Sequence, residues 1–265
     1  AETPGPVKDS KMTPRIADTA KHLWYIYLSL TIACMVAYWL AGMDWFDAIC
    51  HSFATVAIGG FSTHDASLGY FDSPMVNVIC SVFLLIAALN FSLHYAAVSS
   101  RSLKGYLRDP EFKAFLFIQF TLIMICFLVL TLSGYYTSAE EALDQAMIQA
   151  VSISTTAGFA TTDFSSWPAF LPILLIFSSF IGGCASSTGG GLKVVRVLLL
   201  FLQGKREVDR LIHPKAVYSV KLGERAMPDR VVEAVWGFFS AYAIVFVVIM
   251  IGMIATGLDN ISAFT

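Results

Sequence analysis

Two short stretches rich in glycine and hydroxyl side chains lie between long apolar runs. Residues 53–66 read FATVAIGGFSTHDA, and residues 151–164 read VSISTTAGFATTDF. They align at a constant offset, which pairs Gly60 with Gly158, Phe61 with Phe159, Thr63 with Thr161 and Asp65 with Asp163. When no helix uses them, the backbone carbonyls of such a loop can replace the water around a dehydrated alkali cation. Glycine permits the backbone angles that aim those carbonyls, so the repeated stretch indicates cation binding by main-chain oxygens.

We expect the carbonyl oxygens of four consecutive residues in each stretch to bind the ion. These residues are Ala57, Ile58, Gly59, Gly60, Thr155, Thr156, Ala157 and Gly158. Asp65 and Asp163 follow on the outer side, where negative charge raises the local concentration of cations.

The composition is that of a membrane protein. Of the 265 residues, 57% are hydrophobic and 14% are charged, whereas soluble domains have about 45–50% apolar and about 25% charged residues. A helix that crosses a bilayer needs about 20 apolar residues. The runs that meet this length are Leu23–Met43, Met75–Val98, Phe112–Leu132, Leu171–Gly183 continued through Leu192–Leu202, and Val231–Ala255. We therefore expect an all-α integral membrane protein with membrane lipid around it and no nucleic acid partner.

The basic residues fix the orientation of these runs. All 17 lysines and arginines fall in three clusters, within residues 8–21, 101–113 and 193–230. Because lysine and arginine collect on the cytoplasmic side, the stretches Asp44–Pro74 and Ser133–Trp167 begin and end outside. The five cysteines lie in apolar stretches without a paired spacing, so we expect packed thiols rather than disulfides.

Each outer stretch contains a partly apolar segment, Trp45–Phe61 or Ala142–Phe159. Neither can cross the membrane, because the next run must start on the same side. A helix such as Phe46–Val56 is about 16 Å long, about half of a hydrocarbon core of about 30 Å. We therefore expect re-entrant helices that dip in and return as extended chain. The C-terminal end of each helix carries about half a negative charge, which favours a cation near the membrane centre.

A glycine-rich stretch, GGCASSTGGGLK at Gly182–Lys193, interrupts the fourth run. A continuous helix from Trp167 to Leu202 would be about 54 Å long, too long for a bilayer even when tilted. Each of the five glycines disfavours helix by about 1 kcal/mol relative to alanine. One interpretation is a helix kink with close packing through small residues. A phosphate-binding loop is excluded, because it needs Ser or Thr directly after Gly-Lys.

The segments ATVAIGGFSTHD, ISTTAGFATTD and GGCASSTGGGLKVVRV together resemble the Trk-type potassium transporters of the Trk/Ktr/HKT superfamily, specifically the bacterial TrkH-like members. In that family four units of helix, re-entrant pore helix, filter and helix, as in potassium-channel pores, surround one pore with pseudo-four-fold symmetry. The first unit, the fourth filter and the family's pore arginine have no counterpart here. We therefore expect the chain to belong to a longer polypeptide, with pairing of two copies as the alternative.

The resemblance also implies a domain organisation. The expected parts are a cytoplasmic entry segment at 1–21, the second pore repeat at 22–99, the third at 110–204 with an interrupted second helix, a cytoplasmic linker at 205–228, and the truncated start of a further repeat at 229–265.

The function that the resemblance implies is potassium uptake across the bacterial inner membrane, without enzymatic activity. Potassium, or a rubidium-like ion, is expected in the filter, and no covalent cofactor is expected. The glycine-rich stretch is then an intramembrane loop that obstructs the pore and moves during gating. Its residues are Gly182, Gly183, Ser186, Ser187, Thr188, Gly189, Gly190, Gly191 and Lys193. Symport and channel-like flux both remain open.

The family further implies a homodimer and a cytoplasmic nucleotide-binding ring protein (TrkA-like) as regulator. The basic stretch Lys205–Arg230 is either an ordinary positive-inside signal or the contact for that regulator.

Other polar residues suggest alternatives. His51 and His64 lack enough convergent ligands for a metal site, and we expect packing or surface roles for them. Asn90 and His94 share a helix face and either line a cavity or bond a neighbouring helix. An intramembrane hydrolase using Ser62 and His64 lacks a second histidine placed to help. A carrier with a side-chain substrate site at the midplane would need charged residues within the spans, which contain almost none.

Overall fold

The computed structural model describes residues 16–168, 170–214, 216, 218–258 and 263. They form two compact units, and the chain passes from the first to the second after Val194. The first unit holds both glycine-centred stretches. Its elements are α1 (Ile16–Leu40), α2 (Trp45–Val56), the 3-10 helix η1 (Ser67–Phe71), α3 (Pro74–Ala87), α4 (Phe91–Ser100), α5 (Lys104–Arg108), α6 (Pro110–Leu132), α7 (Ala139–Ser154), the 3-10 helix η2 (Phe164–Ser166) and α8 (Leu171–Ser179).

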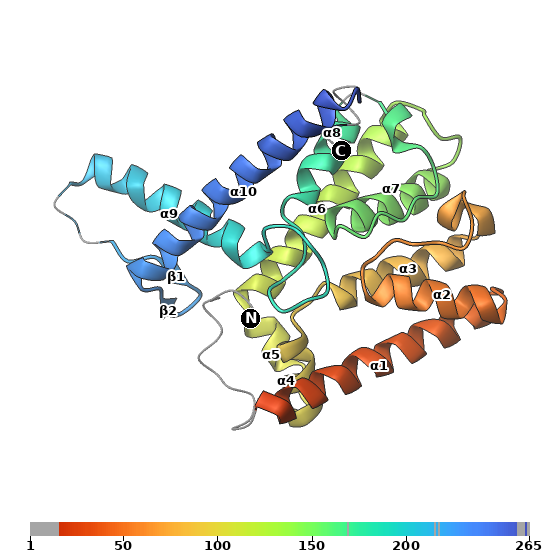
Figure 1. Cartoon of the computed structure of the whole chain (residues 1–265), viewed down its shortest axis with the longest axis horizontal. Helices are drawn as coiled ribbons and strands as arrows, with labels where there is room; N and C mark the ends of the chain where they lie inside the picture. Colours follow the sequence, from red (N-terminus) through yellow and green to blue (C-terminus); the bar gives the residue numbers. More distant parts are fainter. Residues whose placement is uncertain (1–15, 169, 215, 217, 259–262, 264–265) are drawn as a thin grey trace. The chain divides into compact units, whose positions relative to one another are not determined.

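The first unit contains the same arrangement twice. The short helix α2 packs along α1, and the short helix α7 packs along α6 (Figure 1). Each short helix is followed by a connecting stretch that contains one 3-10 helix, η1 or η2, and then by the next apolar helix, α3 or α8. At 1.5 Å per residue, α2 and α7 are about 18 Å and about 24 Å long, too short to cross a bilayer.

Local sequence explains where the short helices begin. Asp44 precedes α2 and accepts a hydrogen bond from the Asp47 amide at 2.7 Å. Ser138 precedes α7 and accepts from the Glu141 amide at 3.1 Å. Such caps satisfy amide groups that have no partner within the helix. The sequence Ser-Ala-Glu-Glu at Ser138–Glu141 also has the spacing of a capping box.

The core of the second repeat in this unit lies between α6, α7 and α8. Ala142, Ala146 and Ala150 recur every fourth residue on α7 and are buried. They pack with Leu122, Cys126, Leu130, Trp167, Leu171 and Leu175. Small side chains on one helix face let neighbouring helices approach closely, so this alanine stripe lets α7 pack closely between α6 and α8.

Among the described residues, three helices are long and apolar enough to cross a membrane: Ala20–Leu40 within α1, α6, and α10 (Asp229–Ala255). A fourth candidate is the pair α3 and α4, which is bent by 88°. The prediction of one continuous helix over Met75–Val98 is therefore wrong. Helix α8 ends at Ser179 and helix is resumed only at Val194, as the glycine content of the fourth run indicates.

The second unit contains α9 (Val194–Ile212), except for its first residue, and α10. Between them lies a hairpin of β1 (Lys221–Leu222) and β2 (Arg225–Ala226). Lys221 pairs with Ala226 and Leu222 with Arg225. A small core joins Leu199, Val220, Met227, Val232 and Val235. The buried Arg206 forms a 2.6 Å ion pair with Asp229 at the start of α10.

Candidate ion-binding site and glycine-rich loop

The two predicted filter segments leave their short helices in the same way. The amides of Ala57 and Thr155 bond to the carbonyls of Phe53 and Val151, at 3.0 Å and 3.1 Å. The next two amides also turn back to the helix, from Ile58 to Thr55 and from Thr156 to Ile153, then from Gly59 to Ala54 and from Ala157 to Ser152. Each pair of bonds is related by the 98-residue offset of the sequence repeat.

The backbone angles of the two segments match as well. Ile58 and Gly60 have positive φ values of 54° and 67°, and the equivalent Thr156 and Gly158 have values of 71° and 89°. Positive φ is uncommon for a β-branched residue such as isoleucine or threonine and carries a strain cost. The segments therefore share a specific, repeated conformation rather than that of an ordinary connector.

The carbonyl oxygens of both segments lack hydrogen-bond partners. Within the part of the chain that the structure describes, no donor bonds to the carbonyls of residues 57–60 or 155–158. Since buried backbone groups are nearly always paired, a row of unused acceptors that includes the buried residues Ile58, Thr155 and Ala157 is unusual. Such a row can bind a cation.

The two segments lie against each other. A Cβ atom added to Gly60 would lie only 1.9 Å from the carbonyl oxygen of Ala157. Beyond the filters, the Gly69 amide bonds to the Ala160 carbonyl at 3.2 Å, and the Ala160 amide bonds to Ser67 Oγ at 3.3 Å. Segments 98 residues apart in sequence are thus neighbours, as a shared ion pathway requires.

Asp65 and Asp163, predicted to stand beyond the filters, are exposed. The Ser165 amide donates to the Asp163 carboxylate at 3.0 Å. Hydrogen bonding from Ser165 lowers the pKa of Asp163, which keeps the carboxylate charged at neutral pH. A fixed negative charge near an entrance attracts cations.

The glycine-rich stretch folds into a closed loop. The amides of Leu192, Lys193 and Val194 bond to the carbonyls of Phe180, Ile181 and Gly183 at 2.8, 2.9 and 3.0 Å. Gly182 has φ 71°, and a Cβ atom there would lie 2.1 Å from the Gly190 carbonyl oxygen. Only glycine fits where the two ends of the loop cross at this distance.

This loop contacts the helix-proximal ends of both filters. The Gly190 amide donates to Thr156 Oγ1 at 2.7 Å, and Thr188 Oγ1 donates to the carbonyl of Val56 at 2.9 Å. A Cβ atom on Gly189 would lie 3.0 Å from the Thr155 carbonyl oxygen. Of the nine predicted loop residues, the structure brings Gly189 and Gly190 directly to a filter segment and Thr188 to the last residue of α2.

The remaining loop residues anchor the loop elsewhere. The hydroxyl of Ser187 donates to the carbonyl of Cys184, and Lys193 Nζ donates to the carbonyls of Ser187 and Gly189. The carbonyl of Ser186 accepts from the Phe91 amide at 3.2 Å. Lys193 thus stabilises the loop from within.

Two further anchors of the loop were not among the predicted residues. The buried carboxylate of Glu111, in the first turn of α6, accepts from the Ala185 amide at 2.7 Å. The break between α3 and α4 frees the carbonyls of Ala87 and Ala88, which accept from Thr188 Oγ1 and from the Cys184 amide. Asn90 caps α4 by accepting from the Ser92 amide, and a cap-forming residue ahead of an apolar run is the one signal for this break.

His51, His64 and His94 form hydrogen bonds within the fold. His94 is buried, with Nδ1 2.6 Å from Tyr106 Oη and Nε2 3.0 Å from the Ile86 carbonyl, so Asn90 and His94 serve local structure. The prediction that no second histidine reaches Ser62 is wrong, because His51 Nε2 lies 2.9 Å from Ser62 Oγ. His51 is nevertheless fully buried. No group of three or more metal-ligating side chains occurs among residues that the structure describes.

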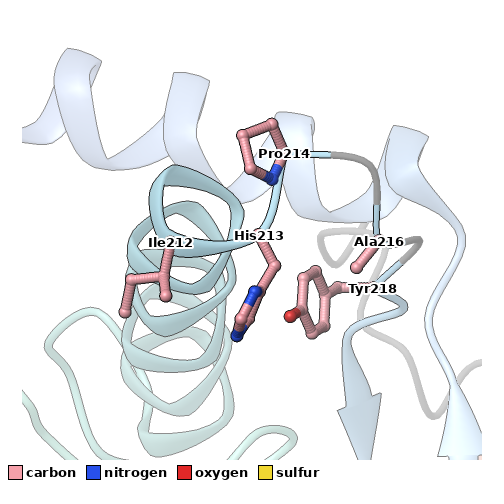
Figure 2. Close-up of a pocket in the computed structure, with 5 residues that line it drawn as sticks. All are labelled: Ile212, His213, Pro214, Ala216 and Tyr218. Carbon is pink, nitrogen blue, oxygen red and sulfur yellow. The ribbon is translucent and has the colours of Figure 1, made fainter.

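A separate hollow of about 670 Å³ lies at the end of α9 in the second unit (Figure 2). Its lining is mostly apolar and consists of Ile212, His213, Pro214, Ala216 and Tyr218. None of these residues belongs to a filter segment or to the glycine-rich loop.

Comparison with known proteins gives one consistent result. The family described as TrkH, cation transport protein, matches residues 1–265. The chain is 68% identical over its full length to the Trk system potassium uptake protein TrkH of Vibrio parahaemolyticus and 64% identical to that of Escherichia coli K12. The crystal structure of the potassium transporter TrkH from Vibrio parahaemolyticus matches 96% of the chain with a TM-score of 0.91. The chain spans 55% of the length of each of these relatives.

Proposed function

Because the chain belongs to the TrkH family of cation transport proteins, we propose that residues 57–60 and 155–158 form part of a potassium-selective filter. This multi-pass membrane protein takes up potassium through main-chain oxygens, and the proposal is supported above all by the eight unpaired carbonyls in two matching, adjoining segments. The relatives carry potassium uptake in their names.

The energetic argument concerns dehydration of the ion. An ion that enters a low-dielectric region loses its water shell at a large cost. Carbonyl oxygens that make no hydrogen bonds offset this loss without first breaking one. The C-terminal ends of α2 and α7, at Val56 and Ser154, each add about half a negative charge next to the filters.

Two segments supply only part of an ion's coordination. We propose that residues 22–99 and 110–204 are two pore repeats of a longer chain whose further repeats complete the ring. The family resemblance implies two assemblies, which we include in this proposal. One is a homodimer, and the other is a contact between the basic stretch Lys205–Arg230 and a cytoplasmic nucleotide-binding ring protein.

The glycine-rich loop is proposed as the gate. It lies against the ends of both filters where α2 and α7 terminate, and its contacts there include hydrogen bonds between neutral groups. Hydrogen bonds between neutral groups contribute only about 0.5–1.5 kcal/mol each. The bonds between the loop and the filter ends can therefore break without unfolding the helices around them, while the Glu111 carboxylate still holds the loop at Ala185.

The test is potassium and sodium flux through the full-length protein in lipid vesicles, comparing wild type with Gly158→Ser. A Cβ atom at Gly158 meets no atom within 4 Å, so the substitution acts through the backbone angle at φ 89°. A left-handed conformation costs a non-glycine residue about 1–2 kcal/mol. The segment should relax to another conformation, and the potassium-to-sodium flux ratio should fall about fivefold to thirtyfold.

The matched control is Gly105→Ala, at an exposed site where an added Cβ meets nothing within 4 Å and φ is not positive. It should keep the wild-type ratio. A wild-type protein without preference for potassium, or a Gly158→Ser variant with unaltered preference, would refute the filter.

A further inference from the structure

The chain just beyond each filter is tied back to its short helix by a threonine. Thr63 Oγ1 donates to Asp47 Oδ1 at 2.5 Å, and Thr161 Oγ1 donates to Gln145 Oε1 at 2.5 Å. Both members of the second pair lie 98 residues after those of the first. In each repeat the threonine stands three residues beyond the last filter glycine, Gly60 or Gly158. We call these two hydrogen bonds the filter clamps.

A second helix residue, one turn after the first, supports each clamp. His51 Nε2 lies 2.9 Å from Ser62 Oγ. The equivalent residue in the other repeat, Gln149, donates from Nε2 to the carbonyl of Thr162 at 3.1 Å and to Thr161 Oγ1 at 3.3 Å. His51 and Gln149 are both completely buried. The outgoing chain therefore has two fixed points on each short helix.

We propose that Asp47 and Gln145 are positioning residues for ion selectivity, each of which fixes the outer end of a filter segment through its clamp. The proposal rests on the filter function proposed above and adds the side chains that set the filter's dimensions. A filter segment is bonded to its helix at the inner end by backbone amides. The clamp holds the other end, so the carbonyls between them have little freedom to move.

The physical reason is the tolerance of the site. Binding geometries must be held to within about 0.5 Å by surrounding packing and hydrogen bonds. The filter segments have no regular secondary structure that would provide such restraint. Without its clamp, a filter segment can move apart or close in to fit ions of another size. The selectivity for one ion then falls before the stability of the fold does.

The two clamps differ in strength. Asp47 is a buried carboxylate whose second oxygen, Oδ2, lies 2.9 Å from His64 Nε2. The His64 ring stacks on Tyr70 with centroids 3.5 Å apart. Gln145 is neutral. Hydrogen bonds to a carboxylate are about twice as strong as bonds between neutral groups, so the Asp47 clamp should carry more of the restraint.

The experiment measures the potassium-to-sodium flux ratio of the full-length protein in vesicles, together with the amount of folded protein. Thr161→Val and Gln145→Leu each remove the neutral clamp and should lower the ratio about fivefold, the equivalent of one hydrogen bond. Thr63→Val should lower it further. Thr161→Ser keeps the hydroxyl and should restore a ratio within about twofold of wild type.

Thr131→Val is the matched control, because it is the same substitution at an exposed site on α6. It should leave the flux ratio unchanged. If wild type prefers potassium while Thr161→Val and Gln145→Leu keep that preference, the clamp inference fails and the filter stands. If these variants lose folded protein but keep the ratio, the clamps are merely structural and the inference is likewise overturned. A wild type without preference instead refutes the filter itself.

Discussion

Gly60 and Gly158 occupy equivalent places at the ends of the two filter segments, but their surroundings differ. Both have positive φ, so any other residue is strained at either site by about 1–2 kcal/mol. A Cβ at Gly60 would also collide with the Ala157 carbonyl at 1.9 Å, whereas a Cβ at Gly158 would face open space. Gly60 is therefore needed both for its backbone angle and for the close contact between the two segments. Gly158 is needed only for its backbone angle.

This difference predicts unequal effects of the same substitution. Gly60→Ala must push the two segments apart, so it should reduce thermal stability by several degrees more than Gly158→Ala, since about 1 kcal/mol shifts the unfolding midpoint by about 2–4 °C in a chain of this size. Thermal unfolding of the purified protein in detergent measures the difference. Equal midpoints for the two variants would show that the contact between the segments is absent in solution.

Ile58 and Thr156 show why residue-level conformation was not predictable from sequence. β-branched residues favour extended structure, and nothing in their own identity indicates a positive φ. The conformation follows from the bonds on either side, because the neighbouring amides return to the last helical turn. Local preference is commonly violated at functional sites, and these two residues are such a case.

At the scale of elements, the short helices were the most predictable part. Residues Phe46–Val56 were expected as a half-length helix, and α2 spans Trp45–Val56. The second short helix was expected within Ala142–Phe159, and α7 spans Ala139–Ser154 because Ser138 caps it earlier. The break between α3 and α4 was not predicted, since a bent apolar run has the same composition as a straight one.

The break also fixes the glycine-rich loop, and this leads to a prediction for the gate. Thr188 Oγ1 donates to the carbonyl of Val56, at the end of α2, and to that of Ala87, at the break. Thr188→Val removes both bonds with little change in volume. If the loop obstructs the pathway, resting potassium flux should rise about fivefold, as the loss of about 1 kcal/mol from the closed position implies.

Shortening the loop within Gly182–Gly191 provides a stronger form of the same test and should raise flux further. The Thr131→Val variant serves again as control, because its side chain is exposed on α6. Unchanged resting flux in both loop variants would leave the glycine-rich stretch as a packing feature of the interrupted helix.

At the scale of the whole molecule, most of what the sequence predicts about the site comes from the internal repeat. A sequence offset of 98 residues appears in the backbone bonds, the φ values and the clamps. Contacts between the repeats were not predictable, because they join residues without matching partners in the pattern. Thr188 with Val56 and Gly60 with Ala157 are examples. Periodicity along a sequence indicates which face of a helix is buried. It does not indicate which distant loop packs against that face.

The distribution of basic residues predicts the orientation of the chain in the membrane, and single cysteines can test it. Asp65 and Asp163 are exposed beyond the filters, and Lys104 is exposed in the basic cluster between the two repeats. A membrane-impermeant maleimide added to intact spheroplasts should label Asp65→Cys and Asp163→Cys. It should label Lys104→Cys only after the membrane is permeabilised, because lysine and arginine mark the cytoplasmic side.

The native cysteines favour this experiment. Cys34, Cys80, Cys126 and Cys184 are buried and only Cys50 is half-buried, so a Cys50→Ala background should show little labelling. Since thiolates are the reactive species, these packed thiols should stay unreactive while the protein is folded. Labelling of Lys104→Cys in intact spheroplasts would invert the orientation. The short helices would then enter from the cytoplasm, and the exposed carboxylates of Asp65 and Asp163 would no longer stand at the outer entrance of the pathway.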